Sequence, residues 1–239
     1  MKYDNPAGRL LEILVKVKNH KKDESARAVW QSVLKLPTAD LNPLLTAKLA
    51  TIMLLPFQTL EMLAEEHPEL TDPPPSWAMK VSQAFQVHNV HGAIDSFSSN
   101  INTDIIAEVK TIAVLLNKGS NRKTITVEEL KKISEVINST LQDVIGSEQI
   151  DDGVRKYLVR SLRNILTAIE EYHLTGATPI LEAVEKTVGH AMVDAKYKSF
   201  LKDSELGNRV LDALQAASCV VTIAVGLPAL AQSAKNFIN

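Results

Sequence analysis

Glycine, cysteine and aromatic residues are all scarce in this chain. Its 239 residues include 9 glycines and a single cysteine, Cys219, and aromatic residues make up 5%. Loops that cradle phosphate groups and tight turns between strands and helices need glycine, because the backbone must approach a ligand closely or adopt a positive φ. Sheet cores draw mainly on β-branched and aromatic residues. The low glycine and aromatic contents together favour a helical protein.

The lone cysteine and the N-terminal residues bear on the compartment. Cys219 has no second thiol with which to form an internal disulfide, and such bonds are usual in proteins of oxidising compartments. The first apolar run, residues 10–17, contains Glu12 and Lys16, whereas a secretory signal has an uninterrupted apolar core. We therefore expect a cytoplasmic protein.

Neither sign of charge dominates the composition. The chain has 26 Lys and Arg against 28 Asp and Glu, which gives a formal net charge of −2. A strongly cationic surface would attract nucleic acid or acidic lipid, and the bulk charge provides none. We expect no nucleic-acid partner, although the net value still leaves room for a local cationic cluster.

Apolar residues recur at steps of three and four along most of the chain, as on one face of a helix. Capping sequences also mark several helix starts. Asn5 and Asn42 each precede a proline, which suits the first helical position because its missing N–H has no helical partner there. Thr126 and Glu129 form a capping box, in which each side chain bonds the other residue's backbone N–H. Without a convincing alternating strand, the sequence predicts an all-α fold.

The longest unbroken apolar pattern runs from Ile94 to Leu116. It predicts one helix of about 24 residues, roughly 36 Å long at about 1.5 Å per residue. Another helix is expected from Thr178 to about Leu201, and an apolar helix from Ser204 to Val225. The predicted fold is a multi-helix bundle with a long central amphipathic helix and an apolar C-terminal helix.

Prolines predict two interruptions. Pro56 should kink or split the apolar stretch 44–66, because proline removes a hydrogen bond and clashes with the preceding turn. Residues 67–76 (HPELTDPPPS) are rich in proline and cannot form a regular helix. We interpret residues 71–76 as a linker between an N-terminal helical part, 1–70, and a C-terminal helical bundle, 77–239. The alternative is one continuous domain that includes residues 1–70.

Residues 213–234 carry no charge. A stretch of this length spans a hydrocarbon core of about 30 Å, but polar residues dilute it and Gly226 and Pro228 interrupt it. Three interpretations remain open, since a helix that is apolar all round is buried in a core, covered by a partner or placed in a membrane. The segment is thus a core helix, an interface or a membrane-inserting element.

Two histidine pairings have the spacing of metal ligands. His88 and His91 are three residues apart and would share a helix face. Glu170 and His173 form a Glu-x-x-His unit, which di-iron bundles use twice, but the sequence contains one copy. The simpler interpretations are a polar helix face for the first pair and, for His173, the last turn of a helix, where a cation favours the dipole. We predict no bound metal or cofactor and keep these four residues as candidates.

Lys156, Arg160 and Arg163 lie at positions i, i+4 and i+7 of a predicted helix, so they would project from one face. We interpret them as a contact for an anionic partner, against the simpler interpretation of a solvated helix face. Aromatic residues are not interleaved with them, which weakens the case for single-stranded nucleic acid. An acidic cluster is a candidate counterpart for these cations, either within the fold or between subunits. It comprises Glu61, Glu65, Glu66, Glu69 and Asp72.

No catalytic constellation is recognisable in the sequence, so no catalytic or cofactor-binding residue is assigned. P-loop, dinucleotide-binding and His-Glu-x-x-His motifs are missing. Our hypothesis is a non-enzymatic protein that acts through protein–protein contact, as an adaptor, an immunity or antitoxin-like partner or an assembly subunit, and binds a partner or a second copy. One alternative is a membrane-acting effector that inserts residues 213–234. Another is a metal-dependent helical enzyme that uses the histidine candidates.

Overall fold

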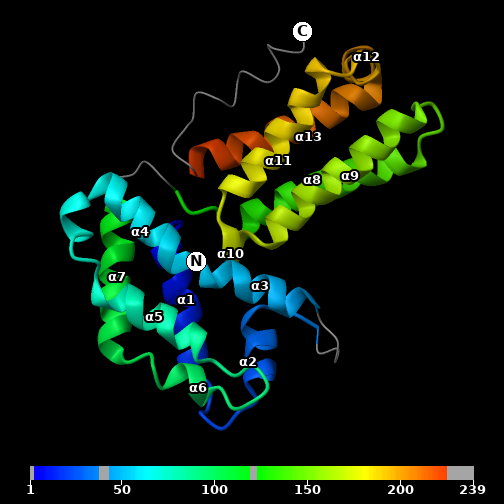
Figure 1. Ribbon diagram of the computed structural model, residues 1–239. Helices are drawn as coiled ribbons and strands as arrows, with labels where there is room; N and C mark the ends of the chain where they lie inside the picture. The colour runs from blue at the N-terminus through cyan, green and yellow to red at the C-terminus, as the bar shows by residue number, and fades with distance from the viewer. Residues whose placement is uncertain (1–2, 38–42, 119–122, 225–239) are drawn as a thin grey trace. The chain divides into compact units, whose positions relative to one another are not determined.

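The computed structural model describes residues 3–37, 43–118 and 123–224. The fold is all-α, as predicted: 77% of the structure is helical, and in the described ranges extended pairing is limited to one isolated bridge between Ser25 and Ala93. The chain divides into two compact units, residues 1–120 (unit 1) and 121–239 (unit 2). Figure 1 shows the helices of each unit.

Unit 1 is built around its first helix, α1. This helix contacts α2, α4 and α7, and its residues Leu10, Leu14 and Val17 are fully buried. The elements of the unit are α1 Pro6–Lys18, α2 Ala26–Val33, α3 Pro43–Met53, α4 Leu55–Glu66, the 3₁₀ turn η1 Pro68–Leu70, α5 Ser76–Gln86, α6 Asp95–Ser98 and α7 Thr103–Lys118.

Asn5 starts α1 as the sequence predicted and also fastens it to α7. Its side-chain oxygen accepts from the Gly8 N–H at 2.8 Å, which caps the helix, and Pro6 follows in the first turn. Its side-chain nitrogen donates to the Ala113 carbonyl of α7 at 3.0 Å. One buried side chain therefore fixes both a helix start and a tertiary contact.

Pro56 splits the apolar stretch as predicted. Helix α3 ends at Met53, Leu54 keeps helical backbone angles, and α4 begins at Leu55 with Pro56 in its first turn. The predicted cap at Asn42 lies outside the described residues. By length and composition, the stretch Pro43–Glu66 is also one candidate membrane span among the described residues, with 28% of its most apolar window buried.

The proline-rich segment lies inside unit 1 and does not separate domains. Helix α4 precedes it and α5 follows it, and these two helices pack against each other. Trp77, directly after the segment, is 1% exposed and belongs to the core of unit 1. The division expected at residues 71–76 is therefore corrected to residues 120–121. Proline stops a helix locally, but contacts between the flanking helices keep both sides in one unit.

The long central helix predicted from Ile94 to Leu116 is wrong, because the structure has two helices there. The short α6 ends at Ser98, and α7 begins at Thr103. Asn100 donates to the Ser96 carbonyl at 2.9 Å, and Asn102 accepts from the Ile105 N–H at 2.9 Å. These side chains close one helix and start the next, as asparagine commonly does. The apolar spacing continues across the break because both helices face the same core.

Unit 2 has four longer helices that pack in a ring. Helix α8 contacts α9 and α13, and α11 also contacts α9 and α13. The elements of the unit are α8 Val127–Gly146, α9 Asp152–Glu170, α10 Tyr172–Thr175, α11 Thr178–Gly189, the 3₁₀ turn η2 His190–Met192, α12 Ala195–Asp203 and α13 Glu205–Ala224. The predicted helix from Thr178 to Leu201 is thus two helices joined by η2.

Capping side chains fix the starts of α8 and α9. The predicted capping box forms, with the Glu129 N–H bonded to Thr126 Oγ1 and the Thr126 N–H bonded to Glu129 Oε2 at 2.8 Å. The bond from the Thr126 backbone lowers the pKa of Glu129. Asp151 caps α9 and pairs with Lys196 Nζ of α12 at 3.1 Å. The bonds from Lys196 and from the first N–H groups of α9 lower the pKa of Asp151.

The first half of the uncharged segment 213–234 belongs to the core of unit 2. Residues 213–224 form the end of α13, where Leu214, Ala217 and Val221 are at most 1% exposed. Residues 225–234 lie outside the described part of the chain. For the described half, the core interpretation is the one that the packing supports.

Candidate functional site

The predicted anionic-partner residues lie on α9, which is held in place by its opposite face. Val154, Leu158, Leu162 and Ile165 are buried in unit 2. Lys156, Arg160 and Arg163 point away from that core and are exposed. The helical period of about 3.6 residues places the two sets on opposite sides. We call Arg155, Lys156, Arg160 and Arg163 the α9 cationic surface.

These four cations surround one surface hollow, which we call the α9 hollow. It has a volume of about 580 Å³ and is also lined by Ile145 of α8 and by Val159 and Asn164 of α9. The structure therefore brings together the three residues predicted from helical spacing. It adds Arg155, which spacing alone did not indicate.

The α9 hollow has no carboxylate in its lining among the described residues. Arg160 also lines a neighbouring hollow, which contains Glu171 and Glu182. Within the described ranges, no ion pair joins Lys156, Arg160 or Arg163 to an acidic group, whereas Arg209 and Lys196 of the same unit have carboxylate partners. Arg155 donates to the Ile150 carbonyl at 3.3 Å. Its Nε is buried without a hydrogen-bond partner among the described atoms.

The predicted pair His88 and His91 does not share a helix face, because α5 ends at Gln86 and both histidines lie in the following loop. Nε2 of His88 accepts the indole N–H of Trp30 at 2.8 Å, and Nδ1 lies 3.1 Å from Ser96 Oγ. Since an indole N–H can only donate, Nδ1 carries the proton and donates to the serine. Both ring nitrogens are thus engaged, and His91 is exposed. The prediction that the two histidines share a helix face is therefore wrong.

The predicted unit of Glu170 and His173 is divided between two helices. Glu170 is the last residue of α9, and His173 lies in α10. Nδ1 of His173 donates to the Glu170 backbone carbonyl at 3.1 Å, so this nitrogen is bonded to the end of α9. That arrangement matches the simpler interpretation of a histidine at a helix terminus. No group of three or more possible metal ligands occurs among the residues that the structure describes.

Sequence reasoning missed a cluster of three rings in unit 2. Tyr157 of α9 stacks on His190 of η2 with ring centroids 3.7 Å apart, and Tyr197 of α12 lies 5.2 Å from both. The Tyr197 hydroxyl donates to the Thr187 carbonyl, and burial raises the pKa of Tyr197. Tyr157 lies more than thirty positions before His190 and Tyr197 in the sequence, so no local pattern indicated the cluster. The cluster joins α9, η2 and α12.

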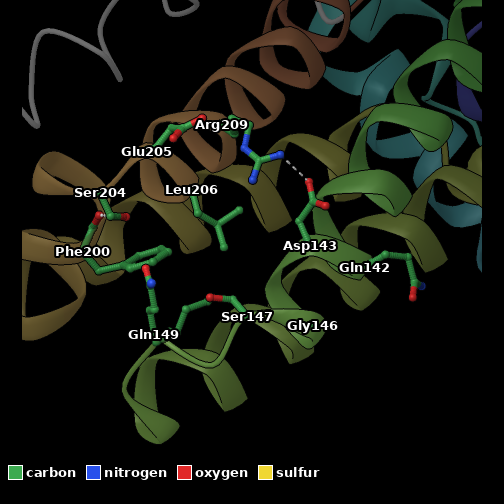
Figure 2. A pocket seen from close by; sticks show the side chains of 11 residues that line it. Gln142, Asp143, Gly146, Ser147, Gln149, Phe200, Ser204, Glu205, Leu206 and Arg209 are labelled. Carbon is green, nitrogen blue, oxygen red and sulfur yellow. Dashed lines mark hydrogen bonds and ion pairs between the residues drawn. The ribbon is translucent and has the colours of Figure 1, made fainter.

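A second hollow of unit 2, of about 520 Å³, lies between the α8–α9 turn and the α12–α13 corner. Figure 2 shows its main polar pair, in which Arg209 is bonded to Asp143 at 2.8 Å. Ser204 is also engaged, since its Oγ donates to the Phe200 carbonyl and accepts from the Gly207 N–H. Because these groups bond one another, the hollow offers a ligand less than the α9 hollow does.

Comparisons of this chain with protein-family models, with curated proteins and with solved structures find no match.

Proposed function

We propose that this protein acts through protein–protein contact and binds an acidic segment of a partner through the α9 cationic surface. The observation that carries the proposal is the gathering of Arg155, Lys156, Arg160 and Arg163 around one hollow, whose described lining contains no carboxylate. Like charges on one helix face repel one another, and an acidic ligand removes that repulsion. The hollow lies wholly within unit 2.

The geometry suits carboxylates carried by a peptide. Lys156 and Arg163 are seven positions apart, or about 10 Å along the helix at about 1.5 Å per residue. Arginine presents a planar fork that bonds carboxylates through two parallel N–H groups. An exposed ion pair contributes about 1 kcal/mol or less, so useful affinity needs several pairs and an apolar contact. Ile145 and Val159 supply that apolar contact in the hollow.

The same lining makes nucleic acid and lipid less suitable ligands. Base stacking needs aromatic side chains, and among the described residues of the lining there are none. A membrane-binding helix exposes apolar residues that protrude beside its cations. Here the apolar surface beside the cations is small, consisting of Ile145, which is 43% exposed, and the half-buried Val159.

The test uses a fluorescently labelled helical peptide that carries leucines and glutamates at i, i+4 and i+7 spacing. We expect the full-length protein to bind it, with an affinity that falls as salt rises, because screening weakens exposed ion pairs. The double variant Arg160→Glu and Arg163→Glu should bind at least about tenfold more weakly, since two attractive contacts become repulsive. Fluorescence anisotropy measures both values.

Lys198→Glu with Lys202→Glu is the matched control, because these two exposed residues of α12 are also close on one helix face. It changes the net charge by the same amount and should leave peptide binding unchanged. Equal loss in the two double variants would contradict a specific site. Binding to an oligonucleotide or to anionic vesicles, without binding to the peptide, would contradict the choice of ligand.

The membrane-effector alternative stays a prediction about residues 213–234. Its test is fractionation of the full chain with a carbonate wash, since an inserted helix resists extraction and a peripheral protein does not. If the protein acts through the α9 hollow and not by membrane insertion, the carbonate wash should release the full chain.

A further inference from the structure

Unit 1 leaves an apolar face uncovered along α3 and α4. Leu44, Leu54 and Phe57 are 53%, 54% and 59% exposed, and Met53 is 45% exposed. We call these four residues the α3–α4 face. Beside it, Met79 of α5 shares a surface hollow of about 470 Å³ with Phe57. Contiguous apolar surface of this kind marks interaction sites in soluble proteins.

The face is one continuous stripe. Exposed positions follow at steps of three or four from Leu44 through Ala47, Ala50 and Leu54 to Phe57, and the helical backbone of Leu54 carries the stripe across the junction of α3 and α4. The other side of the same helices is also apolar and is buried in unit 1 through Leu45, Ile52, Leu55 and Leu63. Helices that are apolar all round are covered on every side in stable proteins.

The charges of residues 43–66 are arranged so that two antiparallel copies of this segment complement each other. Lys48, in α3, is the only cation in the sequence from 43 to 66, and the acidic residues Glu61, Glu65 and Glu66 all lie at the end of α4. A second copy of the segment, running in the opposite direction, places its acidic end beside the lysine end of the first. The helix dipoles of antiparallel helices also attract each other.

We propose that the α3–α4 face is a homodimer interface, in which α3 and α4 of one copy pack antiparallel on α3 and α4 of a second copy about a twofold axis. Leu54 lies midway between Lys48 and Glu61 in the sequence, so it sits near the axis and each lysine lies opposite the glutamate of the other copy. Phe57 packs on the apolar half of the other copy's α3. Such an interface is closed, because the same patch serves on both subunits.

The flanking charges favour a protein over a lipid bilayer as the occupant. Helices that lie on membranes usually carry several Lys or Arg residues at the edge of the apolar face, which attract acidic headgroups. Here a single lysine and three glutamates accompany the apolar residues. Glu61 is exposed on the stripe itself, four positions after Phe57, and burying its charge in lipid is costly.

Sedimentation equilibrium of the full chain, from low micromolar to several hundred micromolar, tests the proposal. We expect a reversible dimer of twice the 26.2 kDa chain mass. Phe57→Glu should weaken dimerisation at least about tenfold, because it places two charges in the apolar centre. Val193→Glu is the matched control, since Val193 is 81% exposed in unit 2, and it should dimerise like the unaltered chain. Circular dichroism checks that each variant is folded.

A charge exchange identifies the antiparallel register. Lys48→Glu and Glu61→Lys should each weaken the homodimer, because each sets like charges opposite one another. An equimolar mixture of the two variants should recover dimerisation, because every pair across the mixed interface is then of opposite sign. The twofold arrangement predicts this recovery, whereas an unrelated contact does not.

A chain that stays monomeric at every concentration, or a dimer that Phe57→Glu leaves intact, overturns the proposal. So does a mixture of the two charge variants that fails to recover the dimer. Flotation of the full chain with phosphatidylcholine–phosphatidylglycerol vesicles, abolished by Phe57→Glu, would identify a lipid surface as the occupant and would overturn it too.

Discussion

At the scale of single residues, His88 illustrates how a hydrogen bond fixes a protonation state. The bond from the Trp30 indole occupies Nε2, and Ser96 accepts from Nδ1. Ser96 Oγ in turn accepts from the Asn89 N–H and donates to the Ala93 carbonyl. A second proton on His88 would face the indole N–H, so the network holds the neutral ring. Burial also lowers the pKa of His88, since the charged ring loses solvation.

This network makes unit 1 sensitive to acid. The pKa of His88 is lower in the folded chain than its reference value of 6.5, so the unfolded chain binds more protons in the interval between the two pKa values. The free energy of unfolding should therefore be constant above the reference value and fall as the pH drops below it. Urea unfolding followed by tryptophan emission measures this in unit 1, because both tryptophans, Trp30 and Trp77, are buried there.

His88→Gln should flatten that pH dependence, because glutamine accepts from Trp30 and does not titrate. His91→Gln is the control, since His91 is exposed in the same loop and stands outside the network. A pH dependence that survives His88→Gln unchanged would show that another group is responsible.

At the scale of elements, the corner between α12 and α13 depends on a close backbone approach. A Cβ added at Gly207 would lie 2.7 Å from the Leu201 Cα and closer still to the Phe200 carbonyl oxygen. Because the obstructing atoms belong to the backbone, they cannot rotate away. Glycine is needed here for space, as Gly207 has no positive φ that would require it.

Gly207→Ala should therefore destabilise unit 2 by about 1–3 kcal/mol, the usual cost of overpacking. Gly189→Ala is the control, because a Cβ at the end of α11 meets nothing within 4 Å, and alanine is the better helix former by about 1 kcal/mol. Urea unfolding followed by circular dichroism compares the two. Tryptophan emission from unit 1 should be unaffected by both. Equal stabilities of the two variants would contradict the predicted clash.

At the scale of the whole molecule, each unit has its own core, and α13 is central to that of unit 2. It packs on α8, α11 and α12 and buries Val210, Leu214 and Val221 almost completely. Burying a valine or leucine side chain contributes about 1.5–3 kcal/mol, and a typical domain is stable by only about 5–15 kcal/mol. The helix thus supplies a large share of the stability of unit 2.

A chain that ends at Asp203 should accordingly lose the fold of unit 2 and keep that of unit 1. We expect helical circular dichroism to fall while the tryptophan emission of unit 1 stays native, because Trp30 and Trp77 both lie before residue 120. A truncated chain that stayed folded and soluble, while the full chain resisted a carbonate wash, would instead support the membrane alternative.

The sequence by itself determined the helical class and several helix starts, as at Asn5 and Thr126, because capping is a hydrogen bond between residues three positions apart. It also placed three cations of the α9 hollow, since helical spacing is local. It could not place the unit boundary, the break before α7 or the exposed α3–α4 face. Those features depend on which helices meet.

Tertiary structure decided what each local pattern became. Asn5 meets α7 across 108 positions, and His88 meets Trp30 across 58. Two histidines at helical spacing can bind one metal only if both lie on one helix and each keeps a ring nitrogen available. His88 lies beyond the end of α5, and its Nε2 is bonded to Trp30 of α2. Packing between distant segments is set by the shape and burial of many side chains at once, and no short stretch of sequence contains that information.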